Sequence, residues 1–125
     1  MKIIDAAFVL KTPSGERVEA PVVIDIDTAA KQVEGAEIAL ESARAAFQKN
    51  RYSEDAHRMI DDAARKYLSI FFGENGVRAL EAASGGNIPS VYIAARPFLK
   101  KYILPAIKKQ SRAKYKAMRR AARRR

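Results

Sequence analysis

The chain of 125 residues contains no cysteine, no tryptophan and a single histidine, His57. Without cysteine it cannot form a disulfide, present a thiolate nucleophile or build a cysteine-ligated zinc or iron–sulfur site. One histidine is too few for a metal site with two histidine ligands. These absences exclude several classes of enzyme and metalloprotein, and we expect no cofactor.

Long apolar runs are also missing. No stretch of the sequence approaches the ~20 consecutive apolar residues that cross a bilayer. The N-terminal segment has only Lys2 before an acidic residue, and no small-residue cleavage site follows a sustained apolar run, so we expect no signal peptide. We therefore expect a cytoplasmic protein. Residues 108–125 lack the bulky apolar face of a membrane-surface helix, so we expect no membrane binding either.

Acidic residues are absent from the last third of the chain. Residues 1–81 hold all 14 Asp and Glu residues and 11 Lys and Arg residues, whereas residues 82–125 hold 13 Lys and Arg residues. The two parts therefore carry net charges of −3 and +13, which sum to +10 for the chain. This asymmetry favours a polyanionic or acidic partner, although a solvated tail that only aids solubility is the simpler alternative. The candidate polyanion-binding residues are Lys108, Lys109, Arg112, Lys114, Lys116, Arg119, Arg120, Arg123, Arg124 and Arg125.

Large apolar side chains are few. Of the hydrophobic residues, 23 are alanine, which favours helix but adds little core volume. A thin core in a short chain favours stabilisation by association, so a homo-oligomer is one expected state.

Two segments near the N-terminus predict a β-hairpin over residues 3–26. Residues 3–11 and 17–26 flank a turn with Pro13 and Gly15, and the second segment alternates apolar and polar residues. Its expected inward face is Val18, Ala20, Val22, Ile24 and Ile26. On the other face, Pro21 lacks an N–H and is expected at an exposed edge.

The remainder of the chain predicts helices, over residues 28–50, 53–72, 76–83 and 89–107. Asp27 or Thr28 is expected to cap the first helix, and Ser53 the second, which Gly73 then ends. The fourth begins after Asn87.

Pro97 and Pro105 interrupt the last apolar stretch. Each proline removes a helical N–H and clashes with the preceding turn, so we expect a kink or a restart at both. Residues 108–125 are expected to be helical near Lys108 and to fray toward the end. The predicted fold is α+β, a hairpin packed on a small helical bundle in residues 1–107, followed by a basic helical tail in residues 108–125.

Chemistry-bearing residues do not assemble into a catalytic pattern. His57 and Asp61 are four residues apart and can meet on one helix face, but a surface contact explains this pair more simply than general-base catalysis. Asp61 and Asp62 are adjacent and point in different directions. Asp25 and Asp27 are better explained by helix capping than by cation binding. We predict no catalytic residue and no metal ligand, and the chain is not expected to be an enzyme.

One segment carries a family resemblance. Residues 67–76, with the sequence YLSIFFGENG, close one helix through Phe72-Gly73-Glu74 and precede a short helix that contains Ala79-Leu80. A Gly/Asn break and the stretch 87–107 then follow. With the hairpin and the two earlier helices, this arrangement resembles the small tail assembly chaperones of long-tailed bacteriophages. The resemblance covers residues 1–107, and the arginine-rich ending departs from it.

The resemblance implies a non-enzymatic helper in the host cytoplasm, absent from the mature virion, whose partners are the tape-measure and tail-tube proteins. Such a chaperone covers the apolar face of a helical client with a complementary groove. The candidate client-binding residues are Val91, Tyr92, Phe98, Leu99, Tyr102 and Ile103. Packing of Phe98, Leu99 and Ile103 beneath the hairpin is the structural alternative. The functional alternative is a small nucleic-acid-binding protein that contacts phosphates through residues 108–125.

Overall fold

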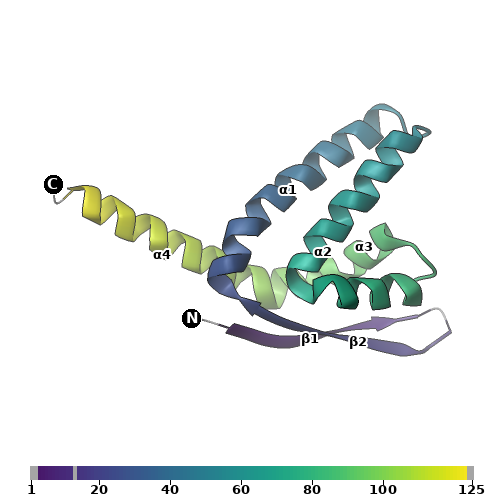
Figure 1. Ribbon diagram of the computed structural model, residues 1–125, viewed down its shortest axis with the longest axis horizontal. Helices are drawn as coiled ribbons and strands as arrows, with labels where there is room; N and C mark the ends of the chain where they lie inside the picture. The colour runs from purple at the N-terminus through teal and green to yellow at the C-terminus, as the bar shows by residue number, and fades with distance from the viewer. Residues whose placement is uncertain (1–2, 13, 124–125) are drawn as a thin grey trace.

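A computed structural model describes the backbone of residues 3–12 and 14–123, and the side chains of that part except residues 3–5, 23, 110–115 and 123. Two strands open the chain, and helices follow without further strands in the described part (Figure 1). The arrangement confirms the predicted α+β class. The elements are β1 (Ile3–Lys11), β2 (Arg17–Asp25), α1 (Ile26–Lys49), α2 (Glu54–Ala83), α3 (Ile88–Phe98), the π-helical turn η1 (Leu99–Ile103) and α4 (Leu104–Arg123).

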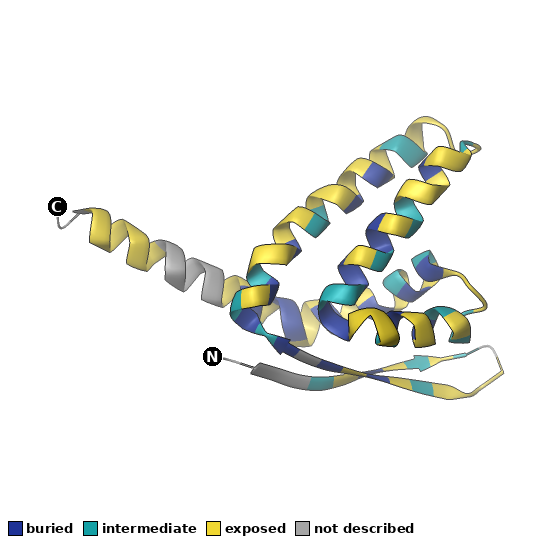
Figure 2. Ribbon diagram, in the orientation of Figure 1, coloured by how far each residue is buried: buried dark blue, intermediate teal, exposed yellow. Residues whose placement is uncertain are grey.

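The hairpin buries the predicted face of its second strand. β1 and β2 pair antiparallel, with Ala6 opposite Val22 and Phe8 opposite Ala20. Phe8, Ala20 and Val22 are buried against the helices, whereas Pro21 on the opposite face is exposed (Figure 2). The alternation in the sequence therefore identified the buried face of β2, because one face of this two-stranded sheet packs on helices and the other meets solvent.

The first helix begins earlier than predicted. Strand β2 passes directly into α1, so Ile26 is already helical and the cap is Asp25, not Asp27 or Thr28. The Asp25 carboxylate accepts a hydrogen bond from the Asp27 backbone N–H at 3.2 Å and another from the Thr28 hydroxyl at 3.2 Å. A connection without a loop explains the shift, since the last strand residue also caps the helix.

Helix α2 bends sharply at Gly73. Ser53 caps it as predicted, through a 3.2 Å hydrogen bond from the Ala56 N–H to its hydroxyl. The backbone of Gly73 has φ 72° and ψ 169°, a region that glycine alone occupies at low cost. Gly76, one turn further, lets the chain fold close to itself, because a Cβ there would lie 2.9 Å from the Cβ of Phe72. The two predicted helices are thus halves of one bent element, and the second half lies along the hairpin (Figure 1).

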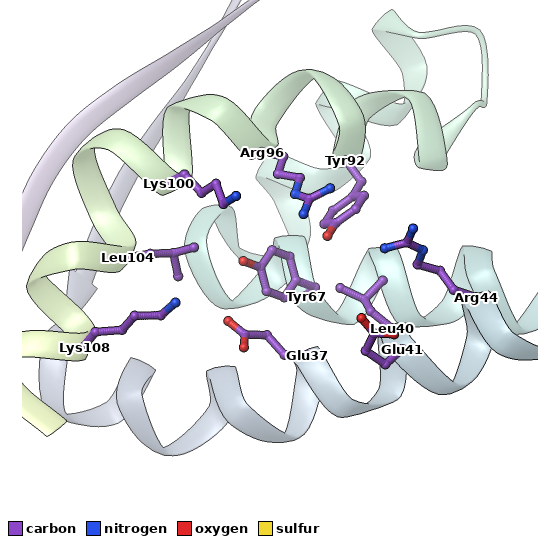
Figure 3. Close-up of a pocket in the computed structure, with 10 residues that line it drawn as sticks. All are labelled: Glu37, Leu40, Glu41, Arg44, Tyr67, Tyr92, Arg96, Lys100, Leu104 and Lys108. Atoms are coloured by element: carbon purple, nitrogen blue, oxygen red, sulfur yellow. The ribbon is translucent and has the colours of Figure 1, made fainter. Parts of the chain in front are cut away.

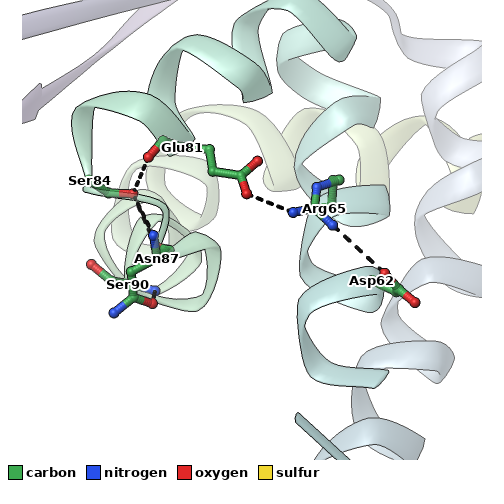
Figure 4. A network of polar contacts seen from close by, with 6 residues as sticks. All are labelled: Asp62, Arg65, Glu81, Ser84, Asn87 and Ser90. Carbon is green, nitrogen blue, oxygen red and sulfur yellow. Dashed lines mark hydrogen bonds and ion pairs between the residues drawn. The ribbon is translucent and has the colours of Figure 1, made fainter. Parts of the chain in front are cut away.

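Polar contacts hold this bend and the turn that follows. Arg65, before the bend, donates to the Glu81 carboxylate after it at 2.7 Å (Figure 4). The N–H of Gly86 bonds to the Glu81 carbonyl at 2.8 Å, which closes the end of α2 in a Schellman turn. Asn87, after which the fourth helix was expected to begin, caps α3 with its side chain accepting from the Ser90 N–H at 3.2 Å.

Pro97 and Pro105 do not interrupt the C-terminal helix, although a kink or a restart was expected at both. Helical backbone continues from Ile88 to Arg123, with Pro97 inside α3 and Pro105 in the first turn of α4. Between them the turn η1 widens to the π-helical register, and the Leu104 N–H bonds to the Leu99 carbonyl five residues earlier. A wider register absorbs the hydrogen bond that Pro105 cannot donate. The helix also continues without interruption across residues 107–108, where the sequence predicted the boundary between the folded domain and the basic tail.

Aromatic rings connect the hairpin to the helices. The ring of Phe8 lies 5.8 Å from that of Phe72 at the bend and 5.6 Å from that of Phe98 in α3, measured between centroids. The largest fully buried side chains belong to the same core cluster as Phe8, and six of them come from both halves of α2 and from the C-terminal helix: Leu68, Phe71, Leu80, Ile88, Leu99 and Ile103.

Replacing the exposed glycines Gly73 and Gly35 by alanine should change the free energy of unfolding in opposite directions. A Cβ meets no atom within 4 Å at either position. Gly73→Ala should lower the free energy of unfolding by about 1–3 kcal/mol, because alanine is strained at a φ of 72°. Gly35→Ala, within the regular helix α1, should raise it by about 0.5–1 kcal/mol. Urea unfolding of both variants tests this, and equal effects would contradict the role assigned to Gly73.

Candidate functional site

A groove runs between α1 and the helix formed by α3, η1 and α4, with the first half of α2 as its floor. It consists of two adjoining cavities of about 460 and 250 Å³. The cavities share four wall residues from α1 and α3, which are Leu40, Arg44, Tyr92 and Arg96. We call the larger cavity the apolar end of the groove and the smaller one its cationic end.

The apolar end exposes hydrophobic side chains from three helices. Phe47 of α1, Ile60 of α2 and Ile93 of α3 line it, and Ile93 is 69% exposed. His57 lies at its margin, with its ring edge-on to Phe47 at 5.1 Å between centroids. The Nε2 atom of His57 is 2.8 Å from the Arg51 carbonyl oxygen, so this histidine ties the start of α2 to the preceding turn.

The cationic end gathers four positive side chains. Arg44 of α1 faces Arg96, Lys100 and Lys108 of the C-terminal helix across the cavity, as Figure 3 shows. Two carboxylates of α1, Glu37 and Glu41, also line it, which leaves an excess of two positive charges. None of the four cations forms an ion pair with a carboxylate within the described part of the chain.

The π-helical turn keeps these residues on one side of the helix. Arg96, Lys100, Leu104 and Lys108 follow one another at four-residue intervals and all line the cavity. In a regular α-helix each interval of four residues would rotate the side chain by about 40°, so such a row would wind away from the groove. The wider turn at Leu99–Ile103 counters that rotation.

Tyr67 closes the floor of the cationic end. Its side chain is only 4% exposed, and its ring contacts Phe71 and Tyr92 edge-on, at 5.2 and 5.5 Å between centroids. Its hydroxyl points into the cavity (Figure 3), and no described residue forms a hydrogen bond with it. Burial raises the pKa of the Tyr67 phenol well above its usual range, and Tyr92 and Glu37 add to this effect, while Arg96 opposes it.

The predicted client-binding residues are mostly in the core. Val91, Leu99 and Ile103 have no exposed surface, so in this conformation they cannot contact a client, and that part of the prediction is corrected. Phe98 is half-buried against Phe8. Tyr102 is exposed but lies outside the groove. Of the six residues, only Tyr92 lines the groove.

The sequence pattern missed the rest of the groove for a simple reason. The broad apolar face of residues 91–107 does not indicate which of its side chains the hairpin covers. Ile93 lies off the face that packs on the core and remains exposed. Its groove partners Phe47 and Ile60 come from two other helices.

The basic tail is an extension of the C-terminal helix. Beyond Ile107, α4 projects away from the rest of the molecule (Figure 1). At about 100° per residue, its described cations fall within one arc of about 120°. They are Lys108, Lys109, Lys116, Arg119 and Arg120, all exposed. The side chains of Arg112, Lys114 and Arg123 and the whole of Arg124 and Arg125 lie outside the described residues.

Metal-binding clusters and membrane-spanning helices are absent from the described part of the chain. Nowhere among the described side chains do three or more acidic or histidine residues gather as a metal ion would require. In the same part of the chain, no helix has the length and hydropathy needed to cross a bilayer.

Comparison with known proteins finds no matching family model, no similar curated protein and no similar solved structure.

The buried phenol should make folding stability depend on alkaline pH. Because the pKa of Tyr67 is raised in the folded state, the unfolded chain loses this proton first as the pH rises above about 10. The stabilisation of the folded state by the protonated Tyr67 phenol is therefore fully present below pH 10. Above pH 10 the free energy of unfolding falls by up to about 1.4 kcal/mol per pH unit. Tyr67→Phe should reduce the slope of unfolding free energy against pH, measured by urea unfolding between pH 9 and 11. Tyr102→Phe, at an exposed ring, should leave the slope unchanged, and an equal change in both variants would contradict this assignment.

Proposed function

We propose that this chain is a non-enzymatic tail assembly chaperone of a long-tailed bacteriophage, which binds the tape-measure protein and assists tail-tube assembly. The observation that carries the proposal is the apolar end of the groove, where Phe47, Ile60 and Ile93 surround an open cavity of about 460 Å³. Hydrophobic surface of this kind on a small protein marks an interaction site, because exposing it to water is unfavourable.

The groove has dimensions that suit a helix. Its α1 wall extends from Glu37 to Phe47, which corresponds to about 15 Å at 1.5 Å per residue. A client segment of about three helical turns would match that length and could place one apolar stripe against the floor. A tape-measure protein is a long helical chain that presents such stripes, and a chaperone would keep it from aggregating before the tube forms.

The identity of the client rests on the family resemblance, and the structure gives its motif a physical role. Phe72-Gly73-Glu74 marks the bend of α2, after which the second half of α2 runs along the hairpin to the turn that begins α3. Without that bend the C-terminal helix would not form the second wall of the groove. We accordingly propose that the motif serves the binding site through the fold and does not contact the client.

Two exposed isoleucines provide a matched test of the groove. Ile93 is 69% exposed within the apolar end, and Ile38 is 61% exposed on α1 outside it. Ile93→Lys should abolish the ability of the protein to keep a tape-measure fragment from the same genome soluble, because a charge would enter an apolar docking surface. Ile38→Lys should preserve that ability. The measurement is the soluble fraction of the co-expressed fragment, with thermal unfolding as a control for folding.

Two results would contradict the proposed site. One is full solubilisation by a folded Ile93→Lys variant. The other is an equal loss in both variants, which would show that any added charge on the helices interferes.

A second candidate function rests on α4. Its cationic arc projects into solvent, and no acidic residue lies within residues 82–125 to neutralise it. Such a face suits the phosphates of a nucleic acid, since lysine and arginine bind phosphates without regard to sequence and release counterions. We propose this as an alternative activity of the same chain, separable from the groove.

Salt dependence tests this second candidate. Replacement of Lys109, Lys116 and Arg120 by Gln removes three exposed charges of the arc while leaving the groove intact. If α4 binds DNA, the slope of log affinity against log salt should become shallower by about 0.9 for each phosphate that the variant no longer neutralises. Fluorescence anisotropy with a short duplex measures both slopes. An unchanged slope, or no binding by the unmodified chain at low salt, would rule this activity out.

A further inference from the structure

We propose that the cationic end of the groove is a carboxylate-binding site, which receives an acidic side chain of the helical segment whose apolar residues occupy the apolar end. This inference rests on the proposed function and adds a chemical requirement for the client. It requires one Glu or Asp at a fixed distance from the apolar stripe.

The charges at this end are not balanced by the protein itself. Arg44, Arg96, Lys100 and Lys108 line the cavity, and none forms an ion pair with a carboxylate in the described part of the chain. Like charges brought together in this way repel one another, so an anion between them is favourable. Arginine in particular offers a planar pair of donors that matches the two oxygens of a carboxylate.

The hydroxyl of Tyr67 is the second, independent observation. The side chain is almost completely buried, yet its polar end faces the cavity without a hydrogen bond from any described residue. This hydroxyl is accessible from the cavity, since no fully buried side-chain oxygen or nitrogen in the described part lacks a hydrogen-bond partner, so a group bound in the cavity can become its partner. An acceptor oxygen placed in the cavity would provide that partner, and the surrounding cations specify that the acceptor is anionic.

The balance of charge selects a carboxylate over a phosphate group. Glu37 and Glu41 on the α1 wall reduce the excess at this end to two positive charges. A phosphate monoester carries nearly two negative charges and would approach these carboxylates closely. A single carboxylate meets the cations and Tyr67 with half that repulsion.

The distance between the two ends sets the spacing in the client. Ile93 in the apolar end and Lys100 in the cationic end are seven residues apart on one continuous helix, which is about 10 Å or two turns. A client helix lying along the groove therefore needs its acidic residue about two turns from an apolar one. The shared wall of Leu40, Arg44, Tyr92 and Arg96 makes the path between the ends continuous.

Two synthetic peptides test this requirement without knowledge of the client. Both are blocked, alanine-based helices with the same leucine stripe, and they differ at one residue two turns beyond it, which is Glu in one and Gln in the other. The intact protein should bind the Glu peptide about tenfold more tightly than the Gln peptide, as expected of a charge-assisted hydrogen bond, by isothermal titration calorimetry. Tyr67→Phe and Arg96→Gln should each reduce this ratio to about threefold or less.

Arg78→Gln is the matched control. It removes the same charge from the second half of α2, where Arg78 lines a different cavity, and it should retain the tenfold ratio. Equal binding of both peptides by the intact protein would overturn the carboxylate site and leave the apolar docking site standing. Binding of neither peptide would overturn the docking site itself. A ratio that persists in the folded Tyr67→Phe/Arg96→Gln double variant would assign it to the overall positive charge and also overturn the inference.

Discussion

The bend of α2 at Gly73 is the constraint on which the rest of the structure depends. A φ of 72° with a ψ of 169° redirects the chain so that the second half of α2 covers the hairpin. Arg65 and Glu81 then connect the two halves. After the bend, α3 and α4 return past α1, which α4 contacts. Because the groove needs both of those walls, a single backbone conformation determines whether a binding surface exists.

The C-terminal helix serves two surfaces at once, and this explains its unusual features. Its inner side supplies Val91, Leu99 and Ile103 to the core, while its outer side presents Ile93 and a row of cations. A regular α-helix cannot hold a row at four-residue intervals in one direction over about three turns. The π-helical turn between Pro97 and Pro105 corrects that drift, so the prolines that suggested a break instead mark the place where the helix is adjusted to the groove.

Local signals in the sequence predicted the buried face of the second strand, the cap Ser53, the helix start at Asn87 and the break at Gly73, because each depends mainly on neighbouring residues. The passage of β2 directly into α1 was not predictable in this way, since a capping Asp25 and a strand-ending Asp25 look alike. The groove was missed for a stronger reason. It depends on which apolar side chains remain uncovered after three helices pack, and that is decided by tertiary contacts that no single stripe encodes.

The distribution of charge indicates that the two ends of the proposed site and the arc of α4 contribute to binding in different ways. An apolar end supplies most of the binding free energy, since burial of hydrophobic surface scales with area and has no directional requirement. A cationic end adds the smaller part, the roughly tenfold preference expected for an acidic residue, because its own dehydration opposes binding, and it fixes the direction and register of a bound helix. The arc of α4 acts at longer range, where charge changes the rate of encounter more than the stability of the complex. Lys108 belongs to both the groove and the arc, so the described cations of the projecting helix and those of the groove lie on the same C-terminal helix.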